Sequence, residues 1–389
     1  MPSWSRAALA LFAVGWGANQ FASLLPVYRD VDGATAAEVT ALFGAYAVGL
    51  VPALLLVAPV SDRIGRGRVL RPVLVLSFVA TAVLMLGGHS LALLLLGRLL
   101  AGVASGAAFA PGTAWVKELS DAAPGTGARR AAIALSAGFG TGPLVTGVLA
   151  QWAPAPTVLP YVPHMVLTVV VAVLLRPAPE PDPADVATSD PDAATLRQVL
   201  GSRRFLTQVV PTAPWVFGCA TLAFATVPAV VDVPGPEYAL VGALVFLTLG
   251  TGVALQPYGR RLATGVTLAV GMGAGVTGFG VGALAAATGA AWLVVPTCML
   301  LGTAYGFVLV AGLRTVEAIT PPRDLATVNA VFYSLTYVGF AAPYLATLLL
   351  ERLDGVDAMV LLAGLVAVSA VAALLGRGRA ARRPAPSAG

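Results

Sequence analysis

Long apolar stretches alternate with short polar ones along the whole 389-residue chain. Each stretch holds about 20 residues with few charges, which is the length that an α-helix needs to cross a hydrocarbon core of about 30 Å. The pattern predicts twelve such helices, near residues 7–28, 39–60, 69–88, 91–115, 131–151, 156–175, 205–230, 238–257, 264–288, 291–313, 326–349 and 355–376. Strands of a membrane barrel would alternate over about 10 residues instead. We therefore expect an all-α membrane protein.

The composition agrees with this expectation. Hydrophobic residues make up 58% of the chain and charged residues 11%, and the mean hydropathy is +0.87. An average soluble domain carries about 25% charged residues. Cys219 and Cys298 both fall within predicted helices, so a disulfide framework is not expected.

The longest polar segment divides the predicted helices into two sets of six. It covers residues 176–204 and is rich in Pro and Asp, which predicts an extended linker, with a short helix near its end. We expect one six-helix bundle over residues 1–175, a second over residues 205–376, and a basic tail over residues 377–389.

Basic residues are distributed unevenly between the two sides of the predicted bundles. Lys and Arg in short loops stay on the cytoplasmic side of a membrane. With twelve helices, Arg29 and Arg352 fall opposite the termini, and the other loop Lys and Arg residues fall on the side of the termini. We expect both termini to be cytoplasmic, in a bacterial plasma membrane. The net charge of +5 then lies beside anionic lipid and is no sign of nucleic-acid binding.

The two halves share a spaced pattern of small residues. The matching pairs, each 200 positions apart, are Gly102 and Gly302, Gly106 and Gly306, Gly142 and Ala342, and Pro143 and Pro343. The coincidence indicates an internal duplication. Two six-helix halves with a binding site between them are a common plan for transporters.

The loop between the second and third predicted helices carries a recognisable motif. It reads APVSDRIGRGRVL and resembles the loop signature of the major facilitator superfamily, G-x-L-a-D-r-x-G-r-k-x-x-l, at Asp62, Arg63, Gly65 and Arg66. Gly67 stands where the family usually has a basic residue. The resemblance extends over nearly the whole chain and implies the twelve-helix fold of that family, with two pseudo-symmetric bundles.

Two further stretches carry the same resemblance. The fourth helix matches the family pattern R-x-x-q-G-x-g at Arg98 and Gly102, with Ala101 in place of Gln. SAGFGTGPLVTGV in the fifth helix resembles a Gly-Pro motif that is common among exporters of the family, with Thr146 in place of one glycine. The resemblance therefore favours an exporter.

The loop motif also implies a gate at the cytoplasmic ends of the helices. In the family, Asp62 would lie near the start of the eleventh helix, where unpaired amides favour a carboxylate. Gly65 would allow a tight turn, because glycine tolerates positive φ. The expected gate comprises Asp62, Arg63, Gly65, Arg66, Glu118 and Asp121. A generic cluster of positive-inside charges is the alternative.

Arg98 is the one charged residue well inside a predicted helix. An arginine at the centre of a membrane helix costs about 2.5 to 3.5 kcal/mol on insertion scales, so it should face protein or water. With Gly102, Ser105 and Phe109 it forms one stripe at helical spacing, which we expect to face a central cavity. A lone cation there favours neutral, amphiphilic or anionic substrates. A structural arginine is the alternative.

Other polar and aromatic residues within the predicted helices are candidate substrate contacts. The resemblance implies that the first, fourth, seventh and tenth helices line the cavity. The candidates are Asn19, Gln20, Arg98, Ser105, Phe109, Gln208, Trp215, Tyr305, Tyr333 and Tyr337. Packing between helices is the alternative for the amides, and a structural stripe is the alternative for the rings.

Small residues and prolines are expected to set helix packing and bending at the centre of the molecule. These hinge and packing candidates are Gly102, Gly138, Gly142, Pro143 and Pro343. The glycine-rich stretch VGMGAGVTGFGVG lies within an apolar helix, with no strand before it, and does not indicate a nucleotide site.

Protons are a candidate coupling ion. Arginine does not readily titrate, and His164 in the sixth helix is interpreted as a packing residue. Asp62, Glu38 or the substrate itself are the remaining routes for a proton.

Together these features predict a secondary transporter, since the sequence contains no P-loop and ATP is therefore not expected to be the direct energy source. No cofactor and no bound metal are expected. We expect a monomer in the lipid bilayer that exports small hydrophobic or amphiphilic molecules. A sugar or organic-acid importer of the same fold is an alternative, as is a transport-inactive sensor. An enzyme is disfavoured, because no mid-membrane His, Cys and carboxylate groups are arranged for catalysis.

Overall fold

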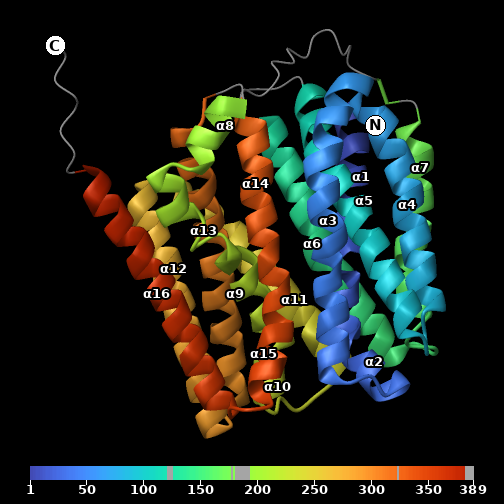
Figure 1. Cartoon of the computed structure of the whole chain (residues 1–389). Coiled ribbons are helices and arrows are strands. Elements are labelled where there is room, and N and C mark those ends of the chain that lie inside the picture. Colours follow the sequence, from blue (N-terminus) through green and yellow to red (C-terminus); the bar gives the residue numbers. More distant parts are fainter. Residues whose placement is uncertain (121–125, 177, 180–192, 322–323, 382–389) are drawn as a thin grey trace, which may run out of the picture.

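The computed structural model describes residues 1–120, 126–176, 178–179, 193–321 and 324–381. These residues are mostly helical, and no strand occurs among them. Figure 1 shows the helices running between two ends of the molecule. The N-terminus and α8 lie at one end, called the terminal face below, and α2 and α10 lie at the other, called the distal face.

The first half of the chain supplies five membrane-length helical segments and a shorter sixth one. They are α1 (Ser3–Asn19), a 3-10 turn (Gln20–Leu24) and α2 (Leu25–Asp32); α3 (Ala36–Ile64); α4 (Arg66–Leu86); α5 (Leu91–Glu118); α6 (Thr126–Trp152); and a 3-10 turn (Leu159–Tyr161) with α7 (Val162–Leu175). The 3-10 turn after Asn19 breaks the first segment, which the apolar pattern alone had predicted as one helix.

The second half repeats this plan after the short helix α8 (Ala193–Leu200). Its segments are a π-helical turn (Phe205–Val209), α9 (Pro214–Ala225) and α10 (Val227–Val230); α11 (Glu237–Arg261); α12 (Thr264–Thr288); a 3-10 turn (Ala291–Leu293) with α13 (Val294–Ile319); α14 (Leu325–Tyr337), a 3-10 turn (Val338–Ala341) and α15 (Ala342–Leu350); and α16 (Gly355–Ala381).

The described residues form eleven helical segments that are long and apolar enough to cross a membrane, and the shorter apolar helix Leu159–Leu175 occupies the place of the sixth predicted span. Pro160 and Pro163 lie in the first turns of this segment, where the missing N–H of proline is tolerated. The twelve predicted helices are thus all present, and the chain is a multi-pass membrane protein.

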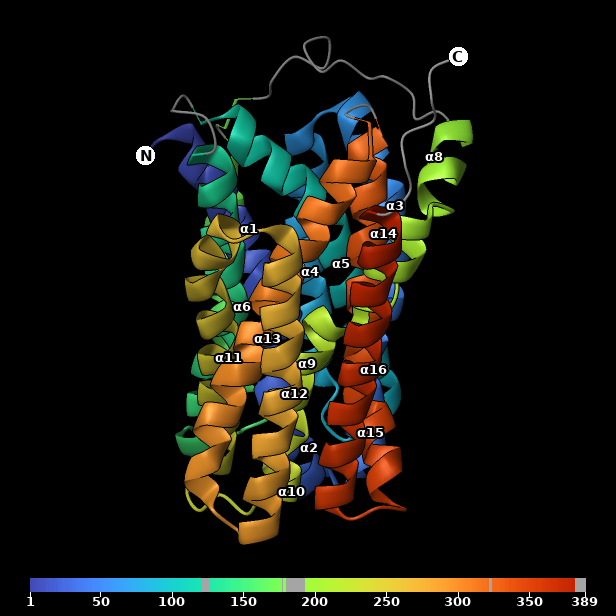
Figure 2. The ribbon, with the colours of Figure 1, turned by 90° about the vertical axis from the view of Figure 1, so that its left-hand side faces the viewer.

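Each half packs as a bundle of its own. In the first half α5 lies against α3 and α4, and α1 lies against α6. In the second half α13 lies against α11 and α12, and α12 lies against α16. The halves meet along two seams, one between α6 and α11 and the other between α3 and the broken helix α14–α15. Figure 2 shows α6 and α11 side by side at one edge of the molecule.

The repeated glycines make the same helix contact in both halves. A Cβ at Gly102 in α5 would overlap the carbonyl oxygen of Tyr46 in α3, and a Cβ at Gly302 in α13 would overlap that of Thr248 in α11. The second glycine of each pair, four residues later, makes the equivalent contact one turn further along. The two bundles are therefore pseudo-symmetric in their central helix pairs, as the duplicated pattern predicts.

Gly65 is the only residue between α3 and α4, and its φ is +106°. A residue with a side chain rarely adopts this conformation, so glycine allows one helix to end and the next to begin within a single residue. This is the tight turn expected at that position.

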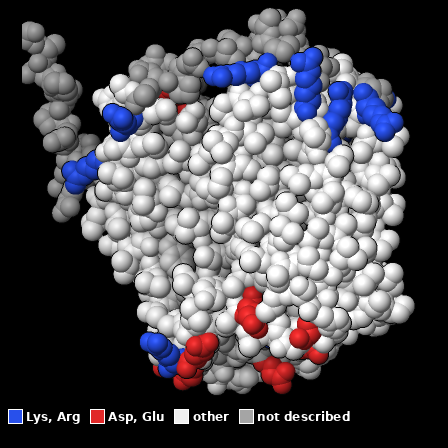
Figure 3. All heavy atoms as spheres, turned by 45° about the vertical axis from the view of Figure 1, so that its right-hand side comes forward, with Lys and Arg blue, Asp and Glu red and all other residues white. Residues whose placement is uncertain are grey.

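The surface of the molecule is divided as a membrane would divide it. Large apolar side chains are exposed on the outermost helices, for example at Val166 and Val173 in α7 and at Val368 and Val371 in α16. Figure 3 shows most of the visible Lys and Arg at the terminal face and most of the visible Asp and Glu at the distal face, with a broad uncharged band between them.

Gly102→Ala should destabilise the protein, because the new methyl group would press on the α3 backbone. Overpacking of this kind costs about 1 to 3 kcal/mol. The measurement is the fraction of protein that stays monodisperse after heating in detergent. Gly273→Ala in α12 is the matched control, since a Cβ there meets nothing within 4 Å and alanine is the better helix former. Equal melting of the two variants would contradict the packing argument.

Candidate functional site

A cavity of about 370 Å³ lies between the two halves on the side of the terminal face. Its walls are mostly apolar and aromatic, with Phe109 of α5 facing Tyr333 and Tyr337 of α14. Lys117 and Glu118, at the terminal end of α5, also line it. Apolar walls with a few polar groups are typical of small-molecule sites.

Aromatic rings from both halves close the distal end of this cavity. Phe43 of α3 stacks on Phe340 at 5.2 Å between ring centroids, and Tyr46 lies 5.4 Å from the same ring. Phe217 of α9 stacks on Tyr337 at 4.7 Å and also contacts Phe340 at 5.2 Å. Each such pair contributes about 0.5 to 1.5 kcal/mol beyond area burial. We call these five residues the aromatic plug.

A second hollow, of about 390 Å³, lies on the distal side of the aromatic plug. It is lined by Thr40 of α3, Thr347 of α15 and Phe224 of α9, and Phe224 contacts the ring of Phe43. The aromatic plug therefore separates a distal vestibule from the cavity on the terminal side.

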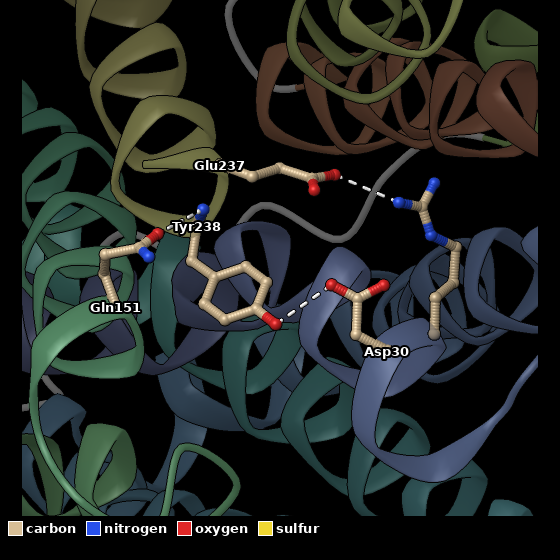
Figure 4. Close-up of polar contacts among 5 residues, drawn as sticks. Asp30, Gln151, Glu237 and Tyr238 are labelled. Carbon is tan, nitrogen blue, oxygen red and sulfur yellow. Dashed lines mark hydrogen bonds and ion pairs between the residues drawn. The ribbon is translucent and has the colours of Figure 1, made fainter. Parts of the chain in front are cut away.

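Polar contacts across the halves lie further out, at the distal ends of the helices. Arg29 of α2 donates to Glu237 of α11 at 3.0 Å, and the Tyr238 hydroxyl donates to Asp30 at 2.9 Å. The Tyr238 amide donates to the Gln151 side chain of α6 at 3.0 Å. Figure 4 shows these contacts meeting where α2, α6 and α11 converge. We call these five residues the distal latch.

The distal latch contributes little to stability, because its ion pair is exposed to solvent. The side chains of Arg29 and Glu237 are 36% and 52% exposed, and exposed ion pairs contribute only about 0 to 1 kcal/mol. The latch can orient the halves and separate without a large cost. The aromatic plug, which is buried, provides most of the closure on this side.

Arg98 lies inside the first half and is fully buried. Its guanidinium donates to three backbone carbonyl oxygens, those of Ala18 at 3.2 Å, Leu42 at 3.2 Å and Phe43 at 3.0 Å. It also lies over the rings of Phe21 and Tyr46, each 4.8 Å from the ring centroid. The described groups that contact it include no carboxylate. Carbonyl dipoles and ring faces balance the charge instead.

The break in the first helix makes this arrangement possible. Ala18 is among the last four residues of α1, whose carbonyls lack partners further along an α-helix. Arg98 supplies a donor to that carbonyl and to two carbonyls of α3, so it ties three helices together. Phe43 and Tyr46 present their other surfaces to the second half, which places Arg98 directly behind the aromatic plug.

The stripe predicted along α5 faces the cavity only at one end. Phe109 lines the cavity. Gly102 lies against the α3 backbone, and the buried hydroxyl of Ser105 donates to the carbonyl of Ala101 at 2.8 Å. The expectation that Arg98, Gly102 and Ser105 face the cavity is therefore wrong for this conformation. The reason is that α3 covers this side of α5 along their close glycine contact.

One protein-family model matches most of the chain. The model described as Major Facilitator Superfamily matches residues 7–343. The chain belongs to the major facilitator superfamily. It is accordingly a membrane transporter and not an enzyme. No curated protein sequence matches the chain significantly.

Solved structures of the superfamily share the fold. One is a crystal structure of a mutant form of the nucleoside transporter NupG, with a TM-score of 0.77, 11% identity, and coverage of 96% of this chain and 99% of that chain. Another is a crystal structure of nucleoside transporter NupG, with a TM-score of 0.72, 12% identity, and coverage of 97% and 99%. At such low identity the likeness concerns the fold alone.

One arginine of the superfamily loop motif forms an ion pair at the terminal face. Arg66 contacts Glu118 at 3.2 Å and donates to Ser61 at 2.9 Å. This pair joins α4 to α5 and therefore lies within the first half. Arg63 is exposed at the end of α3. The side chain of Asp62 and the whole of Asp121 lie outside the described residues.

The two amides of the first segment form packing contacts. Asn19 donates to the carbonyl of Phe139 in α6 at 2.9 Å, and Gln20 donates to the Thr81 hydroxyl of α4 at 3.1 Å. Thr81 lies 2.8 Å from His164, which is also fully buried. The structure thus places Asn19 and Gln20 between helices and away from the cavity.

The aromatic candidates of the second half divide into two groups. Tyr333 and Tyr337 line the cavity, and Tyr305 lies behind them, 5.7 Å from Phe217. Trp215 donates to Ser369 of α16 at 2.9 Å and so faces the periphery of its own half. Gln208 is buried in the π-helical turn at the start of its segment and does not line the cavity.

The hinge and packing candidates lie at close helix contacts. In α6, a Cβ at Gly138 or Gly142 would press on the α1 backbone, and the Pro143 carbonyl lies against Gly242 of the opposite half. Pro343 is buried in the first turn of α15, directly after the 3-10 break. Gly138 and Gly142 thus pack α6 against α1 within the first half, while Pro143 and Pro343 lie where the two halves meet.

The sequence interpretation did not identify the distal latch or most of the aromatic plug. One signal was present for the latch, because Arg29 is among the few basic residues opposite the termini. Its partner Glu237 lies 208 positions away along the chain, so pairing them requires knowledge of how the halves close.

Arg98→Ala should unfold or strongly destabilise the protein in the absence of any ligand, because it removes donors from three buried carbonyls. The Ala18 carbonyl at the end of α1 would be left unpaired, which costs about 1 to 3 kcal/mol, and the charge-assisted contacts that join α5 to α1 and α3 would be lost. Thermal unfolding in detergent measures this effect. If the Arg98→Ala protein is stable and has lost only ligand binding, the structural role is contradicted. Arg98 would then be a substrate contact, as expected from the sequence.

A disulfide across the vestibule should lock the distal side closed. The hydroxyl oxygens of Thr40 and Thr347, from opposite halves, are 3.3 Å apart. Oxidation of a Thr40→Cys/Thr347→Cys variant should abolish transport, and a reductant should restore it. Each single variant is the control, and the native Cys219 and Cys298 are buried. Unchanged transport by the cross-linked protein would show that the distal seam does not open.

Proposed function

We propose that the chain exports small hydrophobic or amphiphilic compounds, by rocking one half against the other. The observation that supports this proposal is the position of the cavity. It lies on the side of the terminal face and is separated from the distal vestibule by the aromatic plug. A compound bound there leaves on the distal side only after the plug and the distal latch have opened.

The proposed direction depends on orientation in the membrane. The excess of Lys and Arg at the terminal face (Figure 3) supports a cytoplasmic position for that face and for both termini. In a bacterial plasma membrane, the cavity would then load from the cytoplasm or the inner leaflet. The Gly-Pro stretch of α6, which resembles that of exporters, supports the same direction.

The chemistry of the cavity supports the proposed substrate class. Phe109, Tyr333 and Tyr337 offer ring faces, and Leu54 and Leu135 offer aliphatic surface. Ring-bearing compounds with a large apolar surface would bind there by stacking and burial. Because Arg98 lies behind the aromatic plug, it would act on substrate only through the rings that it supports.

Exchange for protons would require a titratable group at the cavity. Glu118 lines the cavity and pairs with Arg66, so we assign it the candidate coupling role. Glu38 is less suitable, because its carboxylate accepts from the backbone and hydroxyl of Thr35 and caps the start of α3.

Nucleoside transport is a second candidate. The structural neighbours described above are forms of a nucleoside transporter, and a planar base would also stack between Phe109 and Tyr337. The cavity of about 370 Å³ is large enough for either class.

The test is substrate flux in proteoliposomes, with hydrophobic dyes, amphiphilic antibiotics and nucleosides, in the presence and absence of a pH gradient. Export requires uptake into vesicles in which the terminal face is outside, driven by a lumen that is acidic. Tyr337→Ala should weaken substrate binding about tenfold, as expected for the loss of one stacked ring. Glu118→Gln should remove the effect of the gradient while binding persists.

Tyr258→Ala is the matched control, because this tyrosine is 58% exposed on α11 and lies outside the cavity. Flux of nucleosides alone would replace the exporter proposal with the second candidate. Absence of flux for every class, with ligand binding intact, would favour a sensor.

A further inference from the structure

A groove of about 690 Å³ runs between α6 and α11 near the terminal face. It belongs to the seam between the two halves, on the edge of the molecule where these helices lie side by side (Figure 2). The helix α6 separates it from the central cavity, since Leu135 lines the cavity and the next residue, Ser136, lines the groove.

The groove exists because α6 and α11 diverge. Towards the distal face the helices touch through glycines, with Gly147 against the Tyr238 carbonyl and Gly242 against that of Pro143. Further along α11, a Cβ at Gly250 would meet nothing within 4 Å. The two halves are thus in contact at one end of the seam and apart at the other.

The walls of the groove are cationic at its mouth and apolar beyond. Arg129 of α6 and Arg260 of α11 line it from opposite sides. No Asp or Glu occurs among its described lining residues. Ser136 and Gln256 add hydrogen-bonding groups, and Ile133, which is 52% exposed, adds apolar surface.

We propose that this groove binds the headgroup of an anionic phospholipid, with the phosphate between Arg129 and Arg260 and an acyl chain along the apolar wall. Guanidinium groups bind phosphate oxygens through paired hydrogen bonds, and the terminal face is the one that gathers basic residues (Figure 3). A lipid in this position lies between the halves at their open end. It would therefore oppose closure of the terminal side and favour the conformation described above.

This inference concerns a regulatory lipid and does not depend on the identity of the transported compound. The lipid site and the central cavity use different residues on opposite sides of α6. Either proposal can therefore fail while the other stands.

The test is retention of phosphatidylglycerol by the full-length protein in native mass spectrometry, with phosphatidylcholine as the zwitterionic comparison. Arg129→Gln/Arg260→Gln should weaken retention of phosphatidylglycerol roughly 30-fold, because each arginine near an anionic surface contributes about a factor of five. Arg203→Gln/Arg204→Gln removes the same charge from exposed positions outside the groove and should retain wild-type binding.

A second measurement reports the conformational effect. Spin labels at Ala128 and Tyr258, both exposed at the terminal ends of α6 and α11, should lie further apart when phosphatidylglycerol is present. The Arg129→Gln/Arg260→Gln background should remove this response. Equal loss of retention in both double variants would indicate general surface attraction and overturn the site. Equal retention of the two lipids by the wild type, or a distance insensitive to phosphatidylglycerol, would also overturn it.

Discussion

Close backbone contact at small residues is the constraint on which this structure depends. Helices in a bilayer gain little by burying apolar side chains against one another, because lipid is equally apolar, so packing decides which helices associate. Gly102 and Gly302 bring α5 onto α3 and α13 onto α11, and Gly138 brings α6 onto α1. Because such contacts leave little room for adjustment, we expect each half to move as one body. Movement is left to the surface between the halves.

That surface is built unevenly. On the distal side, buried rings of Phe43, Tyr46 and Phe340 meet across the seam, with the exposed pair of Arg29 and Glu237 outside them. On the terminal side, the cavity and the groove leave space between the halves. The distal side is therefore closed by several individually weak contacts. Opening it does not require the loss of one strong interaction. Arg98 stabilises the rings from behind by fixing α1 and α3 together.

Most of the fold could be predicted from the sequence, because bilayer thickness fixes the length of an apolar helix and the glycine spacing recurs in both halves. Tyr333, Tyr337 and Phe109 were predicted as cavity residues from helical spacing and family resemblance, and they line the cavity. Arg98 was misplaced for a physical reason. Its partners are backbone carbonyls, one at the helix break after α1 and two within α3, and since every residue carries a carbonyl, no side-chain pattern identifies them. The distal latch depends on how the halves close, which spacing along the chain does not encode.

The measurement that tests the central claim most directly is a pair of distances across the two ends of the seam, recorded by pulsed dipolar spectroscopy in lipid. One label pair would join Val31 to Asp232 at the distal face, and the other would join Ile64 to Ala318 at the terminal face, all four positions being exposed. On addition of a transported compound, we predict that the distal distance lengthens in the same population in which the terminal distance shortens. Distances that change in the same direction, or that stay fixed while transport proceeds, would contradict rocking of two rigid halves.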